Sequence, residues 1–441
     1  MSLIQFANYP VRTRKSVLCF LWILLAVVAC NPLWAQAGKK KAYIPDSLST
    51  VPPGNDFANN QSEYSNKRRL ESDNFIMFWA KEYGDDPSRN PDSTKRFDAR
   101  LALNECERFY DYYVNRLKII QKGTSVTDRY KAILLVTGGN NKTAYGWGKD
   151  SVGVLWTPAV RIHSYPYGVL AHELGHAFQY LADCDYGSHF NGPFNEMAAQ
   201  YMLWQVYPQW MTFEHFHLTA YLKNTYYAFL HPENQYHSPY VLEYWANKRG
   251  ETFYGQLLHA VKKGEDAVTT YKRITHTSQE RFNDEMFDAA RRFVTWDLKR
   301  VKEVAKPYAN MHYTKTDAIG KGWHRIANEN CPQNYGYNAI RLQVPASKRK
   351  IGLHFRGLSD EAAAGWRYGF VAVNKTGEVV YGKMNRKAKG AGHFKVPDHT
   401  AFLWLVVSGA PAAHAAVGRK DEDNPRWPYQ FKLDGTDVYR K

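Results

Sequence analysis

Short apolar runs near the start of the folded region predict strands, and a longer amphipathic segment between them predicts a helix. The runs over 74–79 and 131–137 predict buried strands. Residues 97–121 carry apolar side chains at helical spacing, so we expect one long helix that packs on a sheet. A further run over 152–156 predicts a short strand at the edge of that sheet.

The segment 139–148 is rich in glycine but lacks the Gly-Lys-Ser/Thr ending of a phosphate-binding loop. We therefore expect a turn or the rim of a cleft, and no nucleotide. The strand over 152–156 directly precedes a histidine-containing segment. An edge strand there either pairs with an extended substrate backbone or is simply the end of the sheet, and both interpretations stay open.

Residues 195–303 carry a mainly helical pattern, and residues from about 306 onward carry short alternating runs separated by Gly, Pro and Asn. The alternating runs predict a C-terminal β-sandwich. Thr277-Ser-Gln-Glu280 matches a capping box at the start of the last helix. The expected helices cover 195–206, 213–229, 239–249, 251–262 and 278–303. The predicted fold class is α+β, with a mixed sheet and helices over 73–305 and a sandwich over 306–441.

The N-terminus has the pattern of a secretion signal. Basic residues precede an apolar run over 17–29, and Ala35-Gln36-Ala37 forms a cleavage site, so we expect a signal peptide over 1–37. The mature protein is then exported without a transmembrane helix, because the run is too short to span a bilayer. Alternatively, 27–30 resembles a lipobox, and Cys30 would carry a lipid anchor. Residues 38–72 read as a flexible linker.

The charge of the chain bears on its partners, and its cysteine content limits the possible disulfides. The formal charge is +16, and residues 331–441 contain 18 Lys and Arg against 9 Asp and Glu. This basic excess either favours an anionic partner, such as an acidic glycan or a membrane surface, or only keeps the protein soluble. We expect no nucleic-acid partner. Beyond the signal, Cys106, Cys184 and Cys331 permit at most one disulfide and lack zinc-ribbon spacing, so we interpret them as structural.

The segment 165–181 contains His172-Glu173-Leu174-Gly175-His176, an HExxH pattern in a helical context. Histidines four positions apart lie on one helix face, and both imidazoles can reach one metal ion. Glu173 can then act as general base on a metal-bound water. The pattern predicts a zinc site.

A catalytic zinc ion needs a third protein ligand. Gln179 and Ala182 stand where the metzincin extension needs Gly and His, which excludes that class. Glu196, twenty positions after His176, is the favoured third ligand, because a Gly-Pro turn and a new helix can return its carboxylate to the site. The other candidates, from the loop after the helix, are Asp183, Asp185 and His189.

HExxH followed at this spacing by Asn195-Glu196 resembles the gluzincin metallopeptidases. The resemblance implies that His172, His176 and Glu196 bind zinc and that Glu173 is the general base. An Asp one turn after the ligand Glu usually orients the first histidine, and here that place holds Gln200. A neutral amide still accepts the imidazole N–H bond but leaves the histidine less basic.

The order of elements over 73–305 also resembles an uncharacterised group of secreted bacterial proteins of the zincin clan. Such enzymes use a Tyr or His from the helical half to stabilise the oxyanion. His237 and Tyr240 are our candidates, whereas His215 and His217 read as a structural pair.

We therefore expect an exported zinc metallopeptidase, by default an endopeptidase, acting on a protein or glycoprotein substrate. Two alternatives stay open. One is an aminopeptidase or a glycoprotein-directed peptidase. The other is an inactive zincin scaffold that binds glycans through its basic sandwich.

Overall fold

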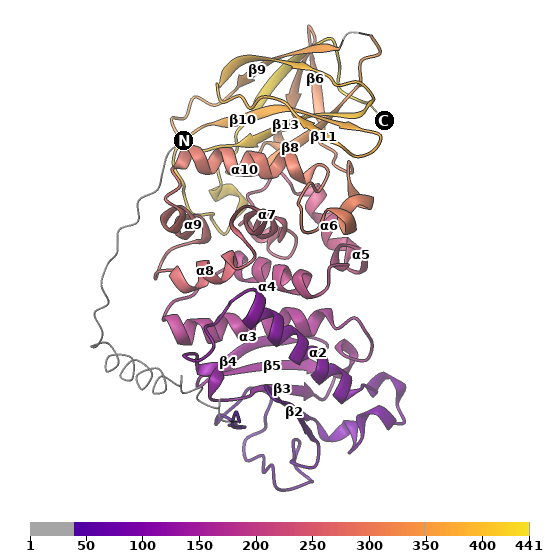
Figure 1. The fold of residues 1–441 in the computed structure, drawn as a ribbon, viewed down its shortest axis with the longest axis vertical. Coiled ribbons are helices and arrows are strands. Elements are labelled where there is room, and N and C mark those ends of the chain that lie inside the picture. The colour runs from indigo at the N-terminus through magenta and orange to yellow at the C-terminus, as the bar shows by residue number, and fades with distance from the viewer. Residues whose placement is uncertain (1–38, 348, 441) are drawn as a thin grey trace, which may run out of the picture. The chain divides into compact units, whose positions relative to one another are not determined.

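The computed structural model describes residues 39–347 and 349–440. The expected signal peptide over 1–37 and lipid-anchor Cys30 lie outside these residues. Residues 40–441 form one compact unit that mixes helices and sheets, which confirms the α+β class (Figure 1). Among the described residues, none of the helices has the length and apolar character that a bilayer-spanning segment requires.

The first sheet has five strands in the order β1-β2-β3-β5-β4 (Figure 1). Strands β2, β3 and β5 are parallel, and the outer strands β1 and β4 run antiparallel to their neighbours. The parallel strands are almost wholly buried, as their apolar runs predict. The strand bounds are β1 Arg69–Glu71, β2 Phe75–Trp79, β3 Ala132–Thr137, β4 Tyr145–Lys149 and β5 Val152–Pro158.

The edge of this sheet is β4, and not β5 as we expected. Strand β4 lies in the glycine-rich segment that we interpreted as a turn or rim. Glycine is a poor strand former, but here it is required. A Cβ at Gly146 would lie 1.8 Å from the carbonyl oxygen of Glu173, and one at Gly148 would lie 2.0 Å from Cδ1 of Tyr180. The two glycines therefore allow β4 to lie directly against the following helix.

The expected flexible linker packs against the rest of the chain over its described part. Leu48 and Tyr64 are buried, and β1 pairs with β2. The indole of Trp156 donates a hydrogen bond to the carbonyl of Ser49 at 2.7 Å. These contacts fix the segment, and its polar composition did not reveal them.

The expected helix over 97–121 is shorter than predicted. Helix α2 covers Ala99–Asp111 and continues as a π-helical turn over Tyr112–Arg116. Lys118 has a left-handed backbone, with φ 55°, which ends the helical run. Helix α2 packs on β2 and on α3, Gly168–Tyr186.

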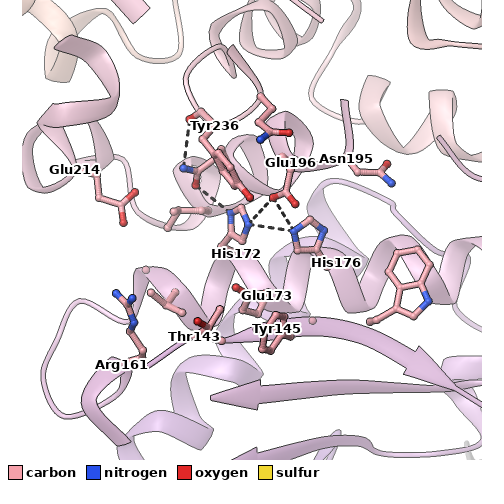
Figure 2. Close-up of a pocket in the computed structure, with 18 of the residues that line it drawn as sticks. Thr143, Tyr145, Arg161, His172, Glu173, His176, Asn195, Glu196, Glu214 and Tyr236 are labelled. Carbon is pink, nitrogen blue, oxygen red and sulfur yellow. Dashed lines mark hydrogen bonds and ion pairs between the residues drawn. The ribbon is translucent and has the colours of Figure 1, made fainter. Parts of the chain in front are cut away.

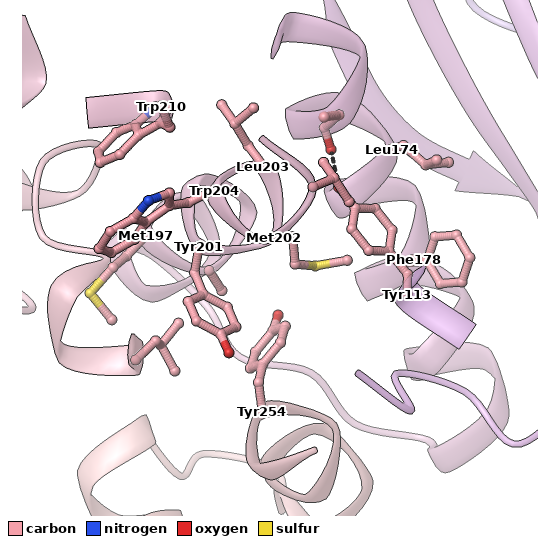
Figure 3. Packing of buried hydrophobic residues seen from close by; sticks show 14 of the residues in the cluster. Tyr113, Leu174, Phe178, Met197, Tyr201, Met202, Leu203, Trp204, Trp210 and Tyr254 are labelled. Atoms are coloured by element: carbon pink, nitrogen blue, oxygen red, sulfur yellow. Dashed lines mark hydrogen bonds between the residues drawn. The ribbon is translucent and has the colours of Figure 1, made fainter. Parts of the chain in front are cut away.

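Helix α3 contacts β4, β5 and α4 (Pro193–Val206). Aromatic and sulfur-containing side chains fill the interior around α3 and α4 (Figure 3). The Tyr113 hydroxyl donates to the Ala171 carbonyl at 2.9 Å and ties α2 to α3. The remaining helices are α5 Trp210–Phe213, α6 His215–Lys223, α7 Tyr240–Arg249, α8 Phe253–Ala260, α9 Ala267–Thr275, α10 Gln279–Phe293 and α11 Lys302–Ala305.

Tertiary contacts shorten two of the expected helices. The carbonyl groups of Thr225 and Tyr226 accept backbone hydrogen bonds from Tyr337 and Gln333, so the helix predicted over 213–229 stops at Lys223. The helix predicted over 278–303 ends at Phe293, and its cap is Ser278 instead of Thr277. We did not predict α9, whose β-branched residues have low helix propensity.

Two antiparallel sheets follow, with the orders β11-β10-β13-β8 and β12-β9-β14-β7-β6. They share one apolar core that includes Phe355, Trp366 and Tyr429, which is the expected β-sandwich. Cys106, Cys184 and Cys331 are all free thiols. The strand bounds are β6 Thr316–Gly320, β7 Trp323–Ile326, β8 Tyr337–Leu342, β9 Lys350–Gly357, β10 Trp366–Asn374, β11 Val379–Tyr381, β12 Lys389–Lys395, β13 Thr400–Gly409 and β14 Tyr429–Asp434.

Candidate metal centre

Helices α3 and α4 supply the side chains of the candidate site. His172, Glu173 and His176 lie in the middle of α3, and Glu196 lies in the first turn of α4. The two helices approach closely at Gly175, where a Cβ would lie 3.3 Å from Cα of Ala199. This close approach directs Glu196 at the two histidines (Figure 2).

Three potential ligand atoms form a nearly equilateral triangle. The Nε2 atoms of His172 and His176 are 3.1 Å apart, and Oε2 of Glu196 is 3.1 Å from each. A tetrahedral zinc ion with ligands at about 2.0–2.1 Å would hold them about 3.3–3.4 Å apart. The residues present therefore fit a zinc ion with little movement.

Two glutamines determine which nitrogen of each histidine carries the proton. The amide nitrogen of Gln179 donates to the Asn195 carbonyl at 2.9 Å, so its oxygen faces Nδ1 of His176, also at 2.9 Å. The oxygen of Gln200 faces Nδ1 of His172 at 3.1 Å. Both histidines therefore donate from Nδ1, and their Nε2 lone pairs are available to a metal ion.

Charge in the cluster favours a bound cation. Burial acts to raise the pKa of Glu196, but the hydrogen bonds to His172 and His176 outweigh it and hold the pKa well below its usual range. Burial acts to lower the pKa of His176, but Glu196 raises it overall. Protons and metal ions therefore compete for the same nitrogen.

Glu173 completes the cluster from another side. One ligand atom of each of His172, Glu173 and His176 lies within 4.8 Å of the others, so both glutamates are near the imidazoles. In Figure 2, Glu196 and Glu173 approach the imidazoles from opposite sides, with Glu173 toward Tyr145 of β4. Burial raises the pKa of Glu173 despite the nearby histidines and the Gly146 amide. Oε2 of Glu196 contacts both Nε2 atoms, so Glu196 lies where a third ligand to a shared metal ion would be needed, while Glu173 lies on the other side.

The other loop candidates for the third ligand lie elsewhere. Asp183 pairs with His189 at 3.1 Å, and Oδ1 of Asp185 accepts from the Val126 amide at 2.8 Å. None of the three lines the cleft that contains His172 and His176.

A cleft of about 820 Å³ opens over the cluster. Edge strand β4 forms one wall with Tyr145, Gly146 and Trp147. Helices α3 and α4 form the floor, and the residues around Glu214 and Tyr236 form the opposite side (Figure 2). The cluster is therefore open to a ligand larger than water.

Neither of our oxyanion candidates lines this cleft. Tyr240 is fully buried against Trp204 and Trp296, so that prediction was wrong. His237 does not line the cleft either, and its Nδ1 is engaged by Nδ1 of His217 at 2.7 Å. Packing holds the Tyr240 side chain, and a hydrogen bond holds that of His237, outside the cleft. The sequence pattern did not reveal these contacts.

The sequence reasoning missed Tyr236 and His217, both of which line the cleft. The ring of Tyr236 lies 6.1 Å from that of His172, and burial together with the nearby Glu196 carboxylate raises the pKa of its hydroxyl. His217, which we interpreted as half of a structural pair, contacts Gln200 at 2.9 Å. The only signal for Tyr236 was its place in the segment that we singled out for His237.

Comparison with known proteins identifies a family and, beyond it, only remote structural similarities. The ZmpB metallopeptidase from Clostridium perfringens is 14% identical over 64% of this chain and 61% of that chain, with a TM-score of 0.30. The glycosylation-associated Gap123 complex from Streptococcus agalactiae is 13% identical over 27% of this chain, with a TM-score of 0.17, and only 38% of that chain is matched. These scores are too low to establish a shared fold, and no curated protein matches. A family model matches residues 34–440. The chain therefore belongs to the family of unknown function DUF6055.

Proposed function

We propose that this protein is an exported zinc-dependent metallopeptidase of gluzincin type that hydrolyses peptide bonds in a protein or glycoprotein substrate. One observation carries the proposal. Three lone-pair donors, from His172, His176 and Glu196, converge at 3.1 Å from one another, and glutamine partners hold the imidazole protons on the far side.

Each residue of the cluster has a role that follows from its position. His172, His176 and Glu196 would hold the zinc ion, which supplies a Lewis acid for the scissile carbonyl and lowers the pKa of a water. Glu173, which burial keeps readily protonated, would take a proton from that water and pass it to the leaving amine. The Tyr236 hydroxyl is placed to donate to the developing oxyanion.

Strand β4 supports a peptide as the substrate class. It is the last strand of its sheet among the described residues, so one of its backbone edges has no neighbouring strand. Three of its residues line the cleft beside the histidines. An extended peptide that adds to this edge would place its backbone next to Glu173, because β4 touches α3 there.

The alternative, a scaffold that binds glycans through the basic sandwich, rests on the charge of residues 331–441. The same experiment separates the two functions. A protein mixture is treated with the full chain and with Glu173→Gln, and new N-termini are profiled by mass spectrometry. We expect new termini only with the wild type, while both proteins hold one zinc ion.

Asp183→Asn is the matched control, because Asp183 is a carboxylate of α3 that does not line the cleft. It should cleave like the wild type. A Glu173→Gln protein that cleaves as well as the wild type, or a zinc-loaded wild type without cleavage, would contradict the peptidase proposal.

A further inference from the structure

A chain of hydrogen bonds runs from the first histidine of the cluster through Gln200 and His217 to His237. Nδ1 of His172 contacts Oε1 of Gln200 at 3.1 Å. Nε2 of Gln200 contacts Nε2 of His217 at 2.9 Å, and Nδ1 of His217 contacts Nδ1 of His237 at 2.7 Å. The four side chains come from α3, α4, α6 and the segment before α7.

The direction of every bond in this chain is fixed by its partners. The amide nitrogen of Gln200 also approaches the Tyr236 carbonyl at 3.4 Å, and a carbonyl can only accept. Nε2 of Gln200 is therefore the donor toward His217, and its oxygen is the acceptor from His172. A flipped amide would present N–H to Nδ1 of His172 and place that ring's proton on Nε2, where a metal ion must bind.

His217 holds the amide in this orientation only in one tautomer. Its Nε2 must offer a lone pair to Gln200, so the proton lies on Nδ1 and is donated to Nδ1 of His237. Burial, with smaller effects of His237 and His172, lowers the pKa of His217 to about 3, so the ring is neutral at physiological pH.

One nearby group favours the other tautomer. Oε2 of Glu214 lies 3.6 Å from Nε2 of His217 and would attract a proton there. That oxygen already accepts from the Trp210 indole at 2.5 Å. Trp210 also stacks on the imidazole of His217, with ring centres 5.6 Å apart. Stacking on Trp210 thus opposes rotation of the His217 ring. The bond from the Trp210 indole to Glu214 reduces the pull of that carboxylate on a proton at Nε2 of His217.

We propose that His217 and His237 are positioning residues that act through Gln200 to keep the Nε2 lone pair of His172 available to the metal ion. This neutral relay stands where gluzincins carry an orienting aspartate. The proposal rests on the proposed function only in that His172 binds zinc.

The test measures metal binding and does not depend on cleavage. His217→Phe keeps an aromatic ring beside Trp210 but removes the acceptor. We expect its zinc affinity, measured by competition with a chelator, to fall about tenfold, at the lower end of the about 10–100-fold that loss of an outer partner costs. The visible spectrum of the Co²⁺-substituted protein should also change, because the ligand geometry relaxes.

His217→Gln can restore an acceptor and should recover most of the affinity. His215→Phe is the matched control: His215 lies on the same helix, contacts the Met211 carbonyl, and has no bond to the relay. It should leave zinc affinity and the Co²⁺ spectrum unchanged. If His217→Phe does not fold, His237→Phe removes the next acceptor and should weaken zinc binding in the same direction.

Zinc affinity and a Co²⁺ spectrum that match the wild type in His217→Phe, or in His237→Phe where that variant replaces it, would overturn the relay. A weakened site in a protein whose wild type cleaves no peptide would support the relay while contradicting the peptidase function. If the wild type cleaves peptides but zinc binding is unchanged in these variants, the peptidase function would be supported and the relay contradicted.

Discussion

At the residue scale, small differences in position distinguish the two glutamates of the candidate site. Glu196 and Glu173 are both near the imidazoles, but only Glu196 bonds to both Nε2 atoms. Glu173 lies next to β4, on the side where an added peptide would run. In the proposed mechanism, the same side-chain type would therefore serve as ligand in one place and as base in the other.

Replacement of the ligand carboxylate should release the metal ion. We expect Glu196→Ala to lower zinc affinity by more than about 100-fold, beyond the usual cost of losing an outer partner. Metal content after dialysis, measured by mass spectrometry, checks this. Asp185→Ala is the control and should keep its zinc, because Asp185 caps a backbone amide at the far end of α3. Zinc loss from Asp185→Ala with zinc retained in Glu196→Ala would assign the third ligand to Asp185 instead.

Loss of the hydroxyl should lower kcat at one of two neighbouring tyrosines and leave it unchanged at the other. Tyr236→Phe should lower kcat about 100-fold with little change in KM, as loss of one oxyanion donor does. Tyr240→Phe should leave kcat unchanged, since the ring is fully buried and its hydroxyl has no hydrogen-bond partner. Steady-state kinetics on a cleaved peptide measures both. Equal kinetics of the two variants would remove Tyr236 from the proposed mechanism.

At the scale of elements, the contact between β4 and α3 places an edge strand directly beside the candidate metal cluster. Gly146 lacks the side chain that would separate them, and its backbone amide favours the charged form of the Glu173 carboxylate. The strand is therefore both the proposed peptide-binding edge and a support for the base.

A side chain at Gly146 should damage fold and site together. The new Cβ of Gly146→Ala would lie 1.8 Å from a backbone oxygen, which cannot move as a side chain can. We expect a loss of unfolding free energy at or above the about 1–3 kcal/mol typical of overpacking, with a matching loss of cleavage. Urea unfolding measures the loss. Gly153→Ala, on the adjacent strand, meets the flexible end of Leu181 at 3.0 Å and should cost clearly less.

At the scale of the whole molecule, the sandwich is continuous with the helices. Helix α10 packs on β10 and β13, and Tyr337 and Trp404 of the sandwich belong to the same apolar cluster as α3 and α4. An excised sandwich would expose these side chains to water. Glycan binding by the basic C-terminal residues is therefore best tested on the full chain.

Arg367 of β10 is a buried polar link across this contact. It is 3% exposed and bonds Glu280 at 2.6 Å and Asp284 at 2.7 Å on α10. We expect Arg367→Met to lower the free energy of unfolding by about 2–3 kcal/mol. This is less than the about 3–5 kcal/mol of a broken buried pair, because Asp284 keeps Arg386 as a partner.

Chemical unfolding of the full chain checks this value. Arg281→Met is the control, since the side chain of Arg281 on the same helix is exposed and its partner Glu285 keeps Arg249 and Tyr271; it should change stability by less than about 1 kcal/mol. An Arg367→Met protein as stable as that control would show that Arg367 contributes little to the stability of the contact.

The sequence by itself determined the features that depend on local periodicity. The HExxH spacing put two imidazoles on one helix face, and Glu196 in the first turn of the next helix was predicted to complete the proposed set of ligands. The buried strands β2 and β3 and the C-terminal sandwich also follow from runs of apolar residues.

Only the tertiary structure decided the features that depend on which elements meet. Strand β4 exists because Gly146 and Gly148 fit against α3, although glycine is unfavourable in an isolated strand. Tyr236, and not Tyr240, faces the cleft, because packing buried the second ring. The bond from Gln200 to His217 joins residues on different helices. Such contacts bring together residues far apart in sequence, and local patterns contain no information about them.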